Sequence, residues 1–223
     1  MVIKPEVIVF DMDGVLVDVS ESYRETIVRT VEHFTGRVIE RLTIQDYKNQ
    51  GGWNNDWALS QKICADLGVD VDYDAVVDYF NGLFLEGGLI HRERWVAKPG
   101  FLEDLANRYE LAIFTGRNLI ETSITLEREG WHGRFHIVCT DDVENTKPHP
   151  EGLLKIMAPR PGKELLYLGD SVDDARCARA AGVNFIGIAG GDAELAQLLD
   201  REGAVAVLKD INELEGLLCA ARA

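Results

Sequence analysis

The sequence lacks an apolar run long enough to span a membrane. A transmembrane helix needs about 20 consecutive apolar residues, and no stretch of this 223-residue chain approaches that length. A basic amino-terminal region followed by an apolar segment is also missing, because Pro5 and Glu6 come almost at once. We therefore expect a cytoplasmic protein that does not bind a membrane.

Positive charge is scarce. The chain has 23 Lys and Arg residues against 38 Asp and Glu residues, which gives a net charge of −15. A field of this sign repels a nucleic-acid backbone, so we expect no nucleic-acid partner. It also repels anionic substrates, so a site for one would need a metal ion or basic side chains nearby.

Cysteine is scarce as well, and repeats and low-complexity tracts are lacking. The four cysteines are scattered and show neither the paired spacing of a zinc site nor a disulfide framework. We interpret them as packing residues of a protein in a reducing compartment. They are Cys64, Cys139, Cys177 and Cys219.

The most informative stretch lies near the amino terminus. The apolar run Val7 to Phe10 is typical of a strand buried on both faces of a parallel sheet. Asp11, Asp13 and Gly14 follow it directly, at the strand end where α/β proteins bind ligands. Two close carboxylates can share a hard cation such as Mg²⁺, attack phosphorus or transfer protons. The alternative is an ordinary strand-to-loop junction, where Asp and Gly are common.

Apolar runs alternate with helical patterns from about residue 98 onward. This alternation predicts an α/β fold, a Rossmann-like parallel sheet with helices on both faces. The expected strands are 7–10, 111–114, 136–139, 165–168, 183–188 and 204–208, and the expected helices are 117–129, 150–157, 172–181, 192–201 and 210–221.

Residues 18–90 show helical periodicity without a convincing strand, with helices expected at 20–34, 43–50, 53–67 and 72–85. We therefore predict a mainly α-helical cap domain over residues 17–93, inserted into a core formed by 1–16 and 94–223. The core resumes after Lys98-Pro99-Gly100, where a proline suits a helix start.

Other expected strands also end in polar residues. Thr115-Gly116-Arg117 leads from a strand into a helix, where a hydroxyl and free N–H groups can hold phosphate. Prolines follow Lys147 and stiffen its loop. Asp170 and Asp174 flank the start of another helix, one turn apart. Each motif also has an ordinary structural explanation: Thr-Gly as a cap and turn, Lys147 as a solvated charge, and the aspartates as acids favoured by the helix dipole. Their common position at strand ends nevertheless favours one site.

These motifs resemble the four signature motifs of the haloacid dehalogenase-like superfamily. They are Asp11-Met-Asp13-Gly14, Thr115-Gly116, Lys147-Pro148 and Gly169-Asp170-Ser171-Val172-Asp173-Asp174. The match spans nearly the whole chain, and an insert of this length after the first motif resembles the helical cap of the phosphoglycolate phosphatase-like subfamily.

The resemblance implies a role for each motif residue. Asp11 would be the nucleophile that forms an aspartyl-phosphate, and Asp13 would be the general acid and base. Thr115 and Lys147 would hold phosphate oxygens.

The resemblance also implies a Mg²⁺ site. Its ligands would be Asp11, the backbone carbonyl of Asp13, and Asp170, with Asp174 close by, and Asp173 fits the pattern less well than Asp174. Dehalogenases of the superfamily generally lack a second carboxylate in the first motif, so Asp13 argues against dehalogenation.

Substrate choice is expected to come from the insert. Its most unusual segment runs from Gly51 to Trp57, where Asn54 and Asn55 either recognise substrate or cap a helix. Gly116 and Arg117 are further candidates for substrate binding, although Arg117 could instead pair with an acidic neighbour.

The function that these residues favour is a Mg²⁺-dependent phosphatase of a small phosphorylated metabolite, phosphoglycolate-like or a sugar phosphate. A phosphomutase of the β-phosphoglucomutase type is the enzymatic alternative. A non-catalytic binding module is a third possibility, but such a module has no evident need for Asp13. The sequence does not give the oligomeric state.

Overall fold

The computed structural model describes residues 4–220 and divides the chain into two compact units. One unit comprises Met1–Val17 and Trp95–Ala223, and the other comprises Asp18–Arg94. These limits lie one residue from the domain boundaries expected from the sequence. No helix between residues 4 and 220 is long and apolar enough to cross a membrane.

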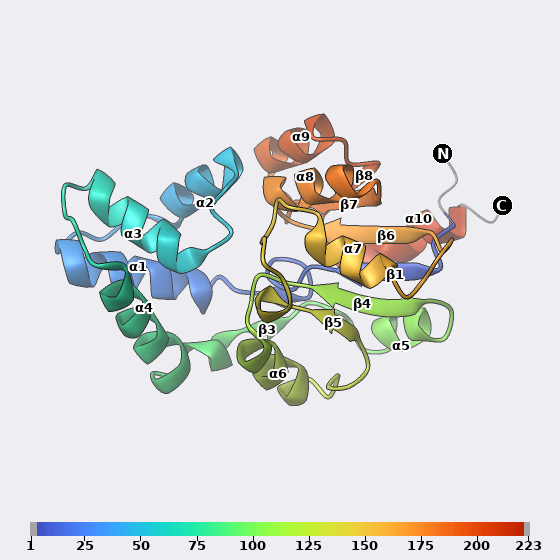
Figure 1. Cartoon of the computed structure of the whole chain (residues 1–223), viewed down its shortest axis with the longest axis horizontal. Coiled ribbons are helices and arrows are strands. Elements are labelled where there is room, and N and C mark those ends of the chain that lie inside the picture. The colour runs from blue at the N-terminus through green and yellow to red at the C-terminus, as the bar shows by residue number, and fades with distance from the viewer. Residues whose placement is uncertain (1–3, 221–223) are drawn as a thin grey trace. The chain divides into compact units, whose positions relative to one another are not determined.

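The larger unit contains a parallel sheet of six strands in the order β5-β4-β1-β6-β7-β8 (Figure 1). The central strand β1 has all four residues fully buried, which explains its unbroken apolar sequence. The expected α/β fold class is confirmed. The strands are β1 Val7–Phe10, β4 Glu110–Phe114, β5 His136–Val138, β6 Leu165–Gly169, β7 Asn184–Ile188 and β8 Ala206–Leu208.

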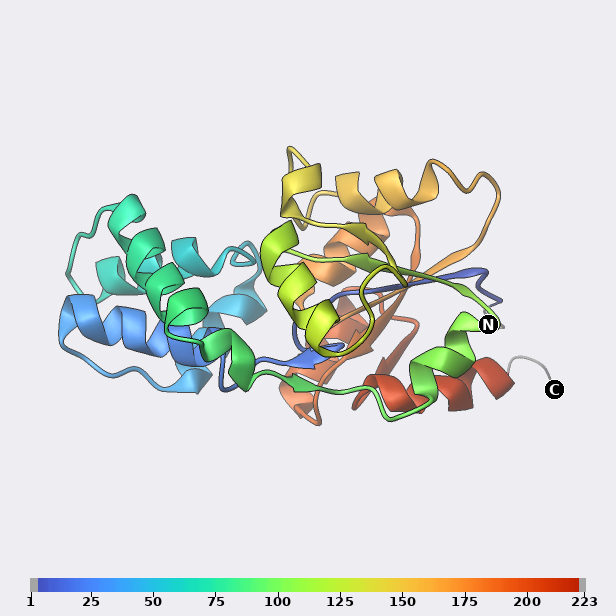
Figure 2. The same cartoon turned by 90° about the horizontal axis from the view of Figure 1, so that it is seen from below.

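Helices cover both faces of this sheet. Val7 and Val9 of β1 share an apolar cluster with α7 (Glu151–Met157), α8 (Val172–Ala181) and α9 (Ala193–Arg201). On the other face, Figure 2 shows α5 (Phe101–Ala106) beside α10 (Leu214–Ala220). An ion pair between Arg108 and Glu215 at 3.0 Å joins the ends of these two helices.

Several element boundaries differ by a few residues from the sequence prediction. Helix α6 (Leu119–Arg128) begins two residues later than expected, because Asn118 is its N-cap and accepts a hydrogen bond from the Glu121 N–H at 2.9 Å. Arg117 therefore lies outside the helix. In addition, β2 (Val17–Asp18) pairs with β3 (Arg94–Trp95), and strands of two residues are too short to show periodicity.

The smaller unit is helical, in agreement with its periodicity. Its core contains the rings of Tyr23, Phe80 and Phe84, with Tyr23 and Phe84 centred 4.1 Å apart. Asp72 caps the fourth helix by accepting hydrogen bonds from two backbone N–H groups. The elements are α1 Tyr23–Thr35, α2 Arg41–Gln50, α3 Asp56–Asp66, α4 Tyr73–Asn81, a π-helical turn Gly82–Glu86 and a 3-10 turn Leu89–Arg92.

Candidate active site

The ends of β1, β4 and β6 bring the predicted motif residues of the larger unit to one edge of the sheet. Asp11 follows β1, Thr115 follows β4 and Asp170 follows β6, and these three strands are neighbours. The Asp11 N–H donates to the Leu168 carbonyl at 2.8 Å, so the backbone of Asp11 is still fixed against β6. The motifs therefore converge because the strands are parallel and adjacent.

Gly14 allows the first and fourth motifs to approach each other closely. Its φ is +74°, a conformation that residues with a Cβ rarely adopt. A Cβ at this position would lie 1.9 Å from Asp170 Oδ2, which is far inside van der Waals contact. Only glycine fits between the two carboxylate-bearing segments without displacing Asp170.

Lys147 is a buried cation between two carboxylates. Its Nζ lies 2.8 Å from Asp11 Oδ1 and 2.8 Å from Asp174 Oδ1. The same Nζ lies 4.8 Å from the ring centre of Phe114 and 5.5 Å from that of Tyr167, where ring faces favour a cation. These contacts fix the ammonium beside the predicted nucleophile.

The charges of this cluster act strongly on one another because water is excluded. Burial raises the pKa of Asp11 well above its usual value; Lys147 opposes this rise, and the neighbouring carboxylates of Asp174 and Asp170 add to it. Burial lowers the pKa of Lys147, but the attraction of Asp11 and Asp174 outweighs burial and raises it. The lysine therefore stays charged, and a cation added to the carboxylates would favour the ionised, nucleophilic form of Asp11.

Asp174 accepts hydrogen bonds from two neighbouring hydroxyl groups. Tyr167 donates its hydroxyl to Asp174 Oδ1 at 2.5 Å, and Ser171 donates its hydroxyl to Oδ2 at 2.6 Å. Although burial raises the pKa of Asp174, Lys147 and these donors outweigh it and lower the pKa. Tyr167 is not among the residues predicted from the sequence, where its one signal is a phenol within an otherwise aliphatic strand.

The carboxylates at this edge fit a hard cation. One oxygen each of Asp11, Asp170 and Asp174 lies within 4.8 Å of the others. Oxygen ligands of this kind suit Mg²⁺. Asp173 is not a member of this group, although its side chain is also buried.

Thr115 and Gly116 form the turn that follows β4. Thr115 is buried, and its Oγ1 accepts a hydrogen bond from the Arg117 N–H at 3.1 Å. A hydroxyl can accept one hydrogen bond and donate another, so this contact leaves its proton available for a phosphate oxygen. Gly116 is exposed.

Arg117 pairs with the second carboxylate of the first motif. Its Nε donates to Asp13 Oδ1 at 2.9 Å, and its Nη2 contacts the same oxygen. The sequence left two interpretations of Arg117 open, substrate binding or pairing with an acidic neighbour. The structure shows the pairing, and the neighbour is the predicted site residue Asp13.

Asn54 and Asn55 belong to the Asp18–Arg94 unit. Asn55 is the N-cap of α3: its side chain accepts a hydrogen bond from the Ala58 N–H at 3.0 Å and donates to the Tyr73 hydroxyl at 3.2 Å. The capping role that the sequence left open is therefore present at Asn55. Asn54 precedes the cap in the turn that begins at Gly51.

The family assignment follows from this site and from the sequence match. The haloacid dehalogenase-like hydrolase family matches residues 8–188, which is most of the chain and includes all four motifs. This protein belongs to that family. The resemblance identified from the motifs is confirmed.

Known proteins match parts of the chain. An imidazoleglycerol-phosphate dehydratase from Phytophthora nicotianae is 30% identical over 197 residues, covering 82% of this chain and 43% of the relative. A phosphoglycolate phosphatase from Escherichia coli is 35% identical over 81 residues, covering 35% of this chain and 31% of the relative. The matched regions thus span less than half the length of either relative.

Solved structures share the whole fold. A haloacid dehalogenase-like protein from Agrobacterium tumefaciens has a TM-score of 0.79 at 21% identity, covering 99% of this chain and 100% of that one. A protein described as a beta-phosphoglucomutase from Thermotoga maritima has a TM-score of 0.69 at 22% identity, covering 97% and 98%. The HAD-hydrolase YfnB from Bacillus subtilis, whose structure is bound to magnesium, has a TM-score of 0.70 at 16% identity, covering 97% and 99%.

Proposed function

We propose that this protein is a Mg²⁺-dependent phosphatase that hydrolyses a small phosphate monoester through an aspartyl-phosphate on Asp11. The observation that carries the proposal is the buried pair of Asp11 and Lys147, 2.8 Å apart at the end of the central strand. A nucleophile beside a fixed cation is suited to phosphoryl transfer, where catalysis is mostly positioning and charge stabilisation.

The first half-reaction transfers the phosphoryl group to the protein. A carboxylate oxygen of Asp11 forms a bond to phosphorus while the bond from phosphorus to the leaving oxygen breaks. The carboxylic acid of Asp13 gives its proton to that leaving oxygen, so the product leaves as an alcohol. Lys147 and the Thr115 hydroxyl hold the oxygens of the transferred group.

The second half-reaction returns Asp11 to its starting form. Water gives a proton to the Asp13 carboxylate and attacks phosphorus, and the bond between phosphorus and the Asp11 oxygen breaks. Inorganic phosphate and a free Asp11 carboxylate result. Asp13 is again an acid, ready for the next substrate.

Mg²⁺ is the proposed cofactor, in line with the usual requirement of the family. The donor set fits a hard cation, because oxygens of Asp11, Asp170 and Asp174 lie within 4.8 Å of one another. Magnesium bound to YfnB supports the same assignment here. When bound, Mg²⁺ would neutralise charge on the phosphoryl oxygens and on the carboxylates.

The substrate is proposed by class. The partial match to a phosphoglycolate phosphatase suggests a short phosphorylated acid, and the name of the Phytophthora relative adds imidazoleglycerol phosphate as a test compound. Sugar phosphates complete the set. We propose a location in the cytoplasm, where such metabolites are found.

A phosphomutase is the second candidate, supported by the fold shared with the Thermotoga maritima protein. It would use the same Asp11 and Asp13 but return the phosphoryl group to a sugar. Incubation with a glucose 1-phosphate separates the two, because a mutase isomerises it without net release of phosphate.

The test is a phosphate-release screen over these compounds with Mg²⁺ and with EDTA. We expect release that EDTA abolishes and that Mg²⁺ restores, and we expect Asp11→Asn to abolish it, because an amide cannot act as the nucleophile. Asp200→Asn in α9 is the matched control, since this exposed aspartate lies outside the site and should retain full activity. Wild-type turnover by Asp11→Asn, or full activity in excess EDTA, would overturn the corresponding part of the proposal.

A further inference from the structure

Arg117 is a buried arginine, and two of its side-chain donors contact the predicted acid and base, Asp13. Its side chain is 1% exposed, against 32% for Asp13. Both Nε, at 2.9 Å, and Nη2 donate to Asp13 Oδ1. Because these contacts use only Oδ1, Oδ2 of Asp13 is the oxygen that can exchange a proton with a substrate.

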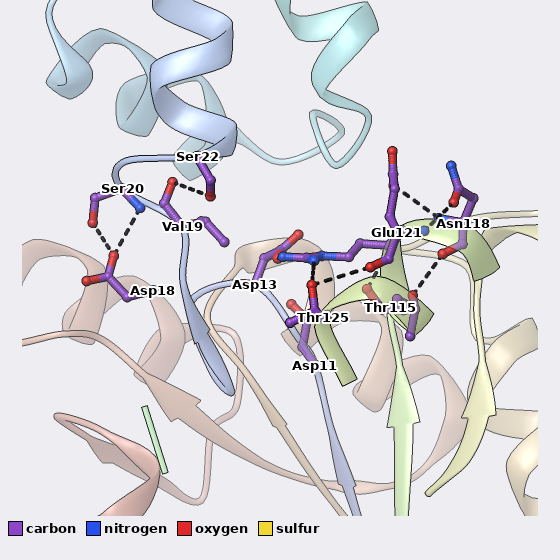
Figure 3. A network of polar contacts seen from close by, with 12 residues as sticks. Asp11, Asp13, Asp18, Val19, Ser20, Ser22, Thr115, Asn118, Glu121 and Thr125 are labelled. Atoms are coloured by element: carbon purple, nitrogen blue, oxygen red, sulfur yellow. Dashed lines mark hydrogen bonds and ion pairs between the residues drawn. The ribbon is translucent and has the colours of Figure 1, made fainter. Parts of the chain in front are cut away.

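The guanidinium is itself anchored away from Asp13. Its Nη1 donates to the Thr125 hydroxyl at 2.9 Å, and its backbone N–H donates to Thr115 Oγ1 at 3.1 Å. Figure 3 shows Asp13, Thr115 and Thr125 close to one another. One residue thus connects the strand end of β4 and helix α6 to the loop after β1.

The chemistry of this contact favours a positioning role over a purely stabilising one. Burying a charged guanidinium is costly unless its donors are satisfied with good geometry. Two donors of one planar guanidinium fork converge on Oδ1 and hold that oxygen in place more rigidly than the single ammonium of a lysine would. The acceptor here is a partly exposed carboxylate that would transfer protons.

We propose that Arg117 is a positioning residue that aims the carboxylate of Asp13 at the leaving oxygen of the substrate. The proposal rests on the proposed phosphatase function. Without the fork, the Asp13 acid would be misaligned when the bond from phosphorus to the leaving oxygen breaks. Arg117 takes no part in bond making, and it acts only through Asp13.

Leaving-group dependence measures this role. An alkoxide leaves poorly unless it is protonated, whereas p-nitrophenolate leaves without help. The ratio kcat/KM reports phosphoryl transfer to the protein, the step in which Asp13 gives its proton. Misaligning Asp13 should therefore slow alkyl phosphates more than p-nitrophenyl phosphate.

The experiment compares kcat/KM for p-nitrophenyl phosphate and for the best alkyl phosphate of the screen. Arg117→Lys keeps the charge and loses the fork, and Thr125→Val removes one anchor while keeping Arg117. We expect Arg117→Lys to lower kcat/KM about 10²-fold for the alkyl ester, the usual cost of a misplaced group, and about tenfold less for the aryl ester. Thr125→Val should show the same preference with a smaller loss.

A double variant tests whether Arg117 acts through Asp13. Adding Arg117→Lys to Asp13→Asn should change kcat/KM little beyond Asp13→Asn alone, because the two residues form one unit. Arg128→Lys in the last turn of α6 is the matched control and should show no preference between the esters.

The outcomes separate this assignment from the proposed function. If the wild-type protein hydrolyses both esters but Arg117→Lys and Thr125→Val lower both equally, Arg117 is merely structural and the positioning role is wrong. A rise in KM alone would instead assign Arg117 to substrate binding. A wild-type protein inactive on every phosphate ester would overturn the proposed function and this role with it.

Discussion

Neighbouring carboxylates of the site differ because their partners differ. Asp11 and Asp174 are both buried and both contact Lys147 at 2.8 Å. Asp174 also accepts hydrogen bonds from Tyr167 and Ser171, which stabilise its charge, and its pKa is lowered. Burial dominates at Asp11 and raises its pKa. Asp174 is thus suited to hold Lys147, and Asp11 depends on cations to remain ionised.

This dependence predicts a large effect of Lys147→Met. Removing one partner of a buried ion pair typically costs about 3–5 kcal/mol, and here two carboxylates lose their shared cation. We expect a loss of this size in the free energy of unfolding at pH 7, measured by urea titration, together with loss of phosphate release. The loss should shrink as the pH falls, because Asp11, whose pKa is raised by burial, can then take up a proton and needs the lysine less.

Lys163→Met is the matched control. Lys163 pairs with Glu110 at the surface, where ion pairs contribute about 0–1 kcal/mol. Equal destabilisation by the two substitutions would contradict the importance of the buried cluster.

The segment between β5 and α7 shows how one element supports the site. Glu151, in the first turn of α7, accepts hydrogen bonds from the backbone N–H groups of Glu144 and Asn145, each at 3.0 Å. The loop that carries Lys147 is thereby tied to the helix that follows it. These backbone donors and Lys155 lower the pKa of Glu151 to about 2.

A pH dependence of stability follows from this lowered pKa. A group whose pKa is lower in the folded state contributes stability above its unfolded value, and the contribution disappears as the pH falls through the folded value. Glu151→Gln should therefore lower the urea midpoint at pH 7, and the difference from wild type should narrow between about pH 4.5 and about pH 2.

Glu144→Gln removes a carboxylate from the same loop and is the control. No side-chain hydrogen bond of Glu144 contributes to the network described above, so we expect its urea midpoint to track that of the wild-type protein across this range. If the urea midpoint of Glu151→Gln differed from that of the wild-type protein by the same amount at every pH, the lowered pKa of Glu151 would contribute nothing to stability.

The residues expected to carry out the chemistry and the residues expected to choose the substrate belong to different units of the molecule. The motif residues all belong to the unit formed by Met1–Val17 and Trp95–Ala223. In the proposed mechanism they act on the phosphoryl group and on the oxygen atoms bound to it. We therefore expect the Asp18–Arg94 unit, which has its own aromatic core, to discriminate among the rest of each substrate.

Asn54 and Asn55 provide a matched pair for this expectation. Asn55→Ala should lower the free energy of unfolding by about 1 kcal/mol, the usual cost of losing an N-cap, because Asn55 caps α3. Asn54→Ala should instead change the ranking of substrates in the phosphate-release screen, while activity on p-nitrophenyl phosphate survives better. If Asn54→Ala lowers the activity on every substrate by the same factor, the turn has only a structural role. Specificity must then come from other residues of the unit.

Patterns in the amino-acid sequence were sufficient to predict the sheet, the helical insert and the positions of the motifs. The unbroken apolar run Val7 to Phe10 predicted a central parallel strand, because both faces of such a strand are buried. Three motifs follow β1, β4 and β6, and they lie at the same edge of the sheet because these strands are parallel and adjacent. Local pattern was sufficient because each of these features depends on residues close together in the chain.

The pairwise contacts between side chains within the site became evident only in the folded structure. Arg117 reaches Asp13 across 104 positions, and Lys147 reaches Asp11 across 136. Tyr167 was not singled out from the sequence, because its hydroxyl finds Asp174 only once β6 and α8 are packed. Helix α6 begins two residues later than expected because Asn118 caps it. Arg117 therefore lies in the turn before the helix, where its side chain contacts the carboxylate of Asp13 from another strand end. Such contacts depend on the path of the backbone and on rotamers in three dimensions, which periodicity and spacing do not encode.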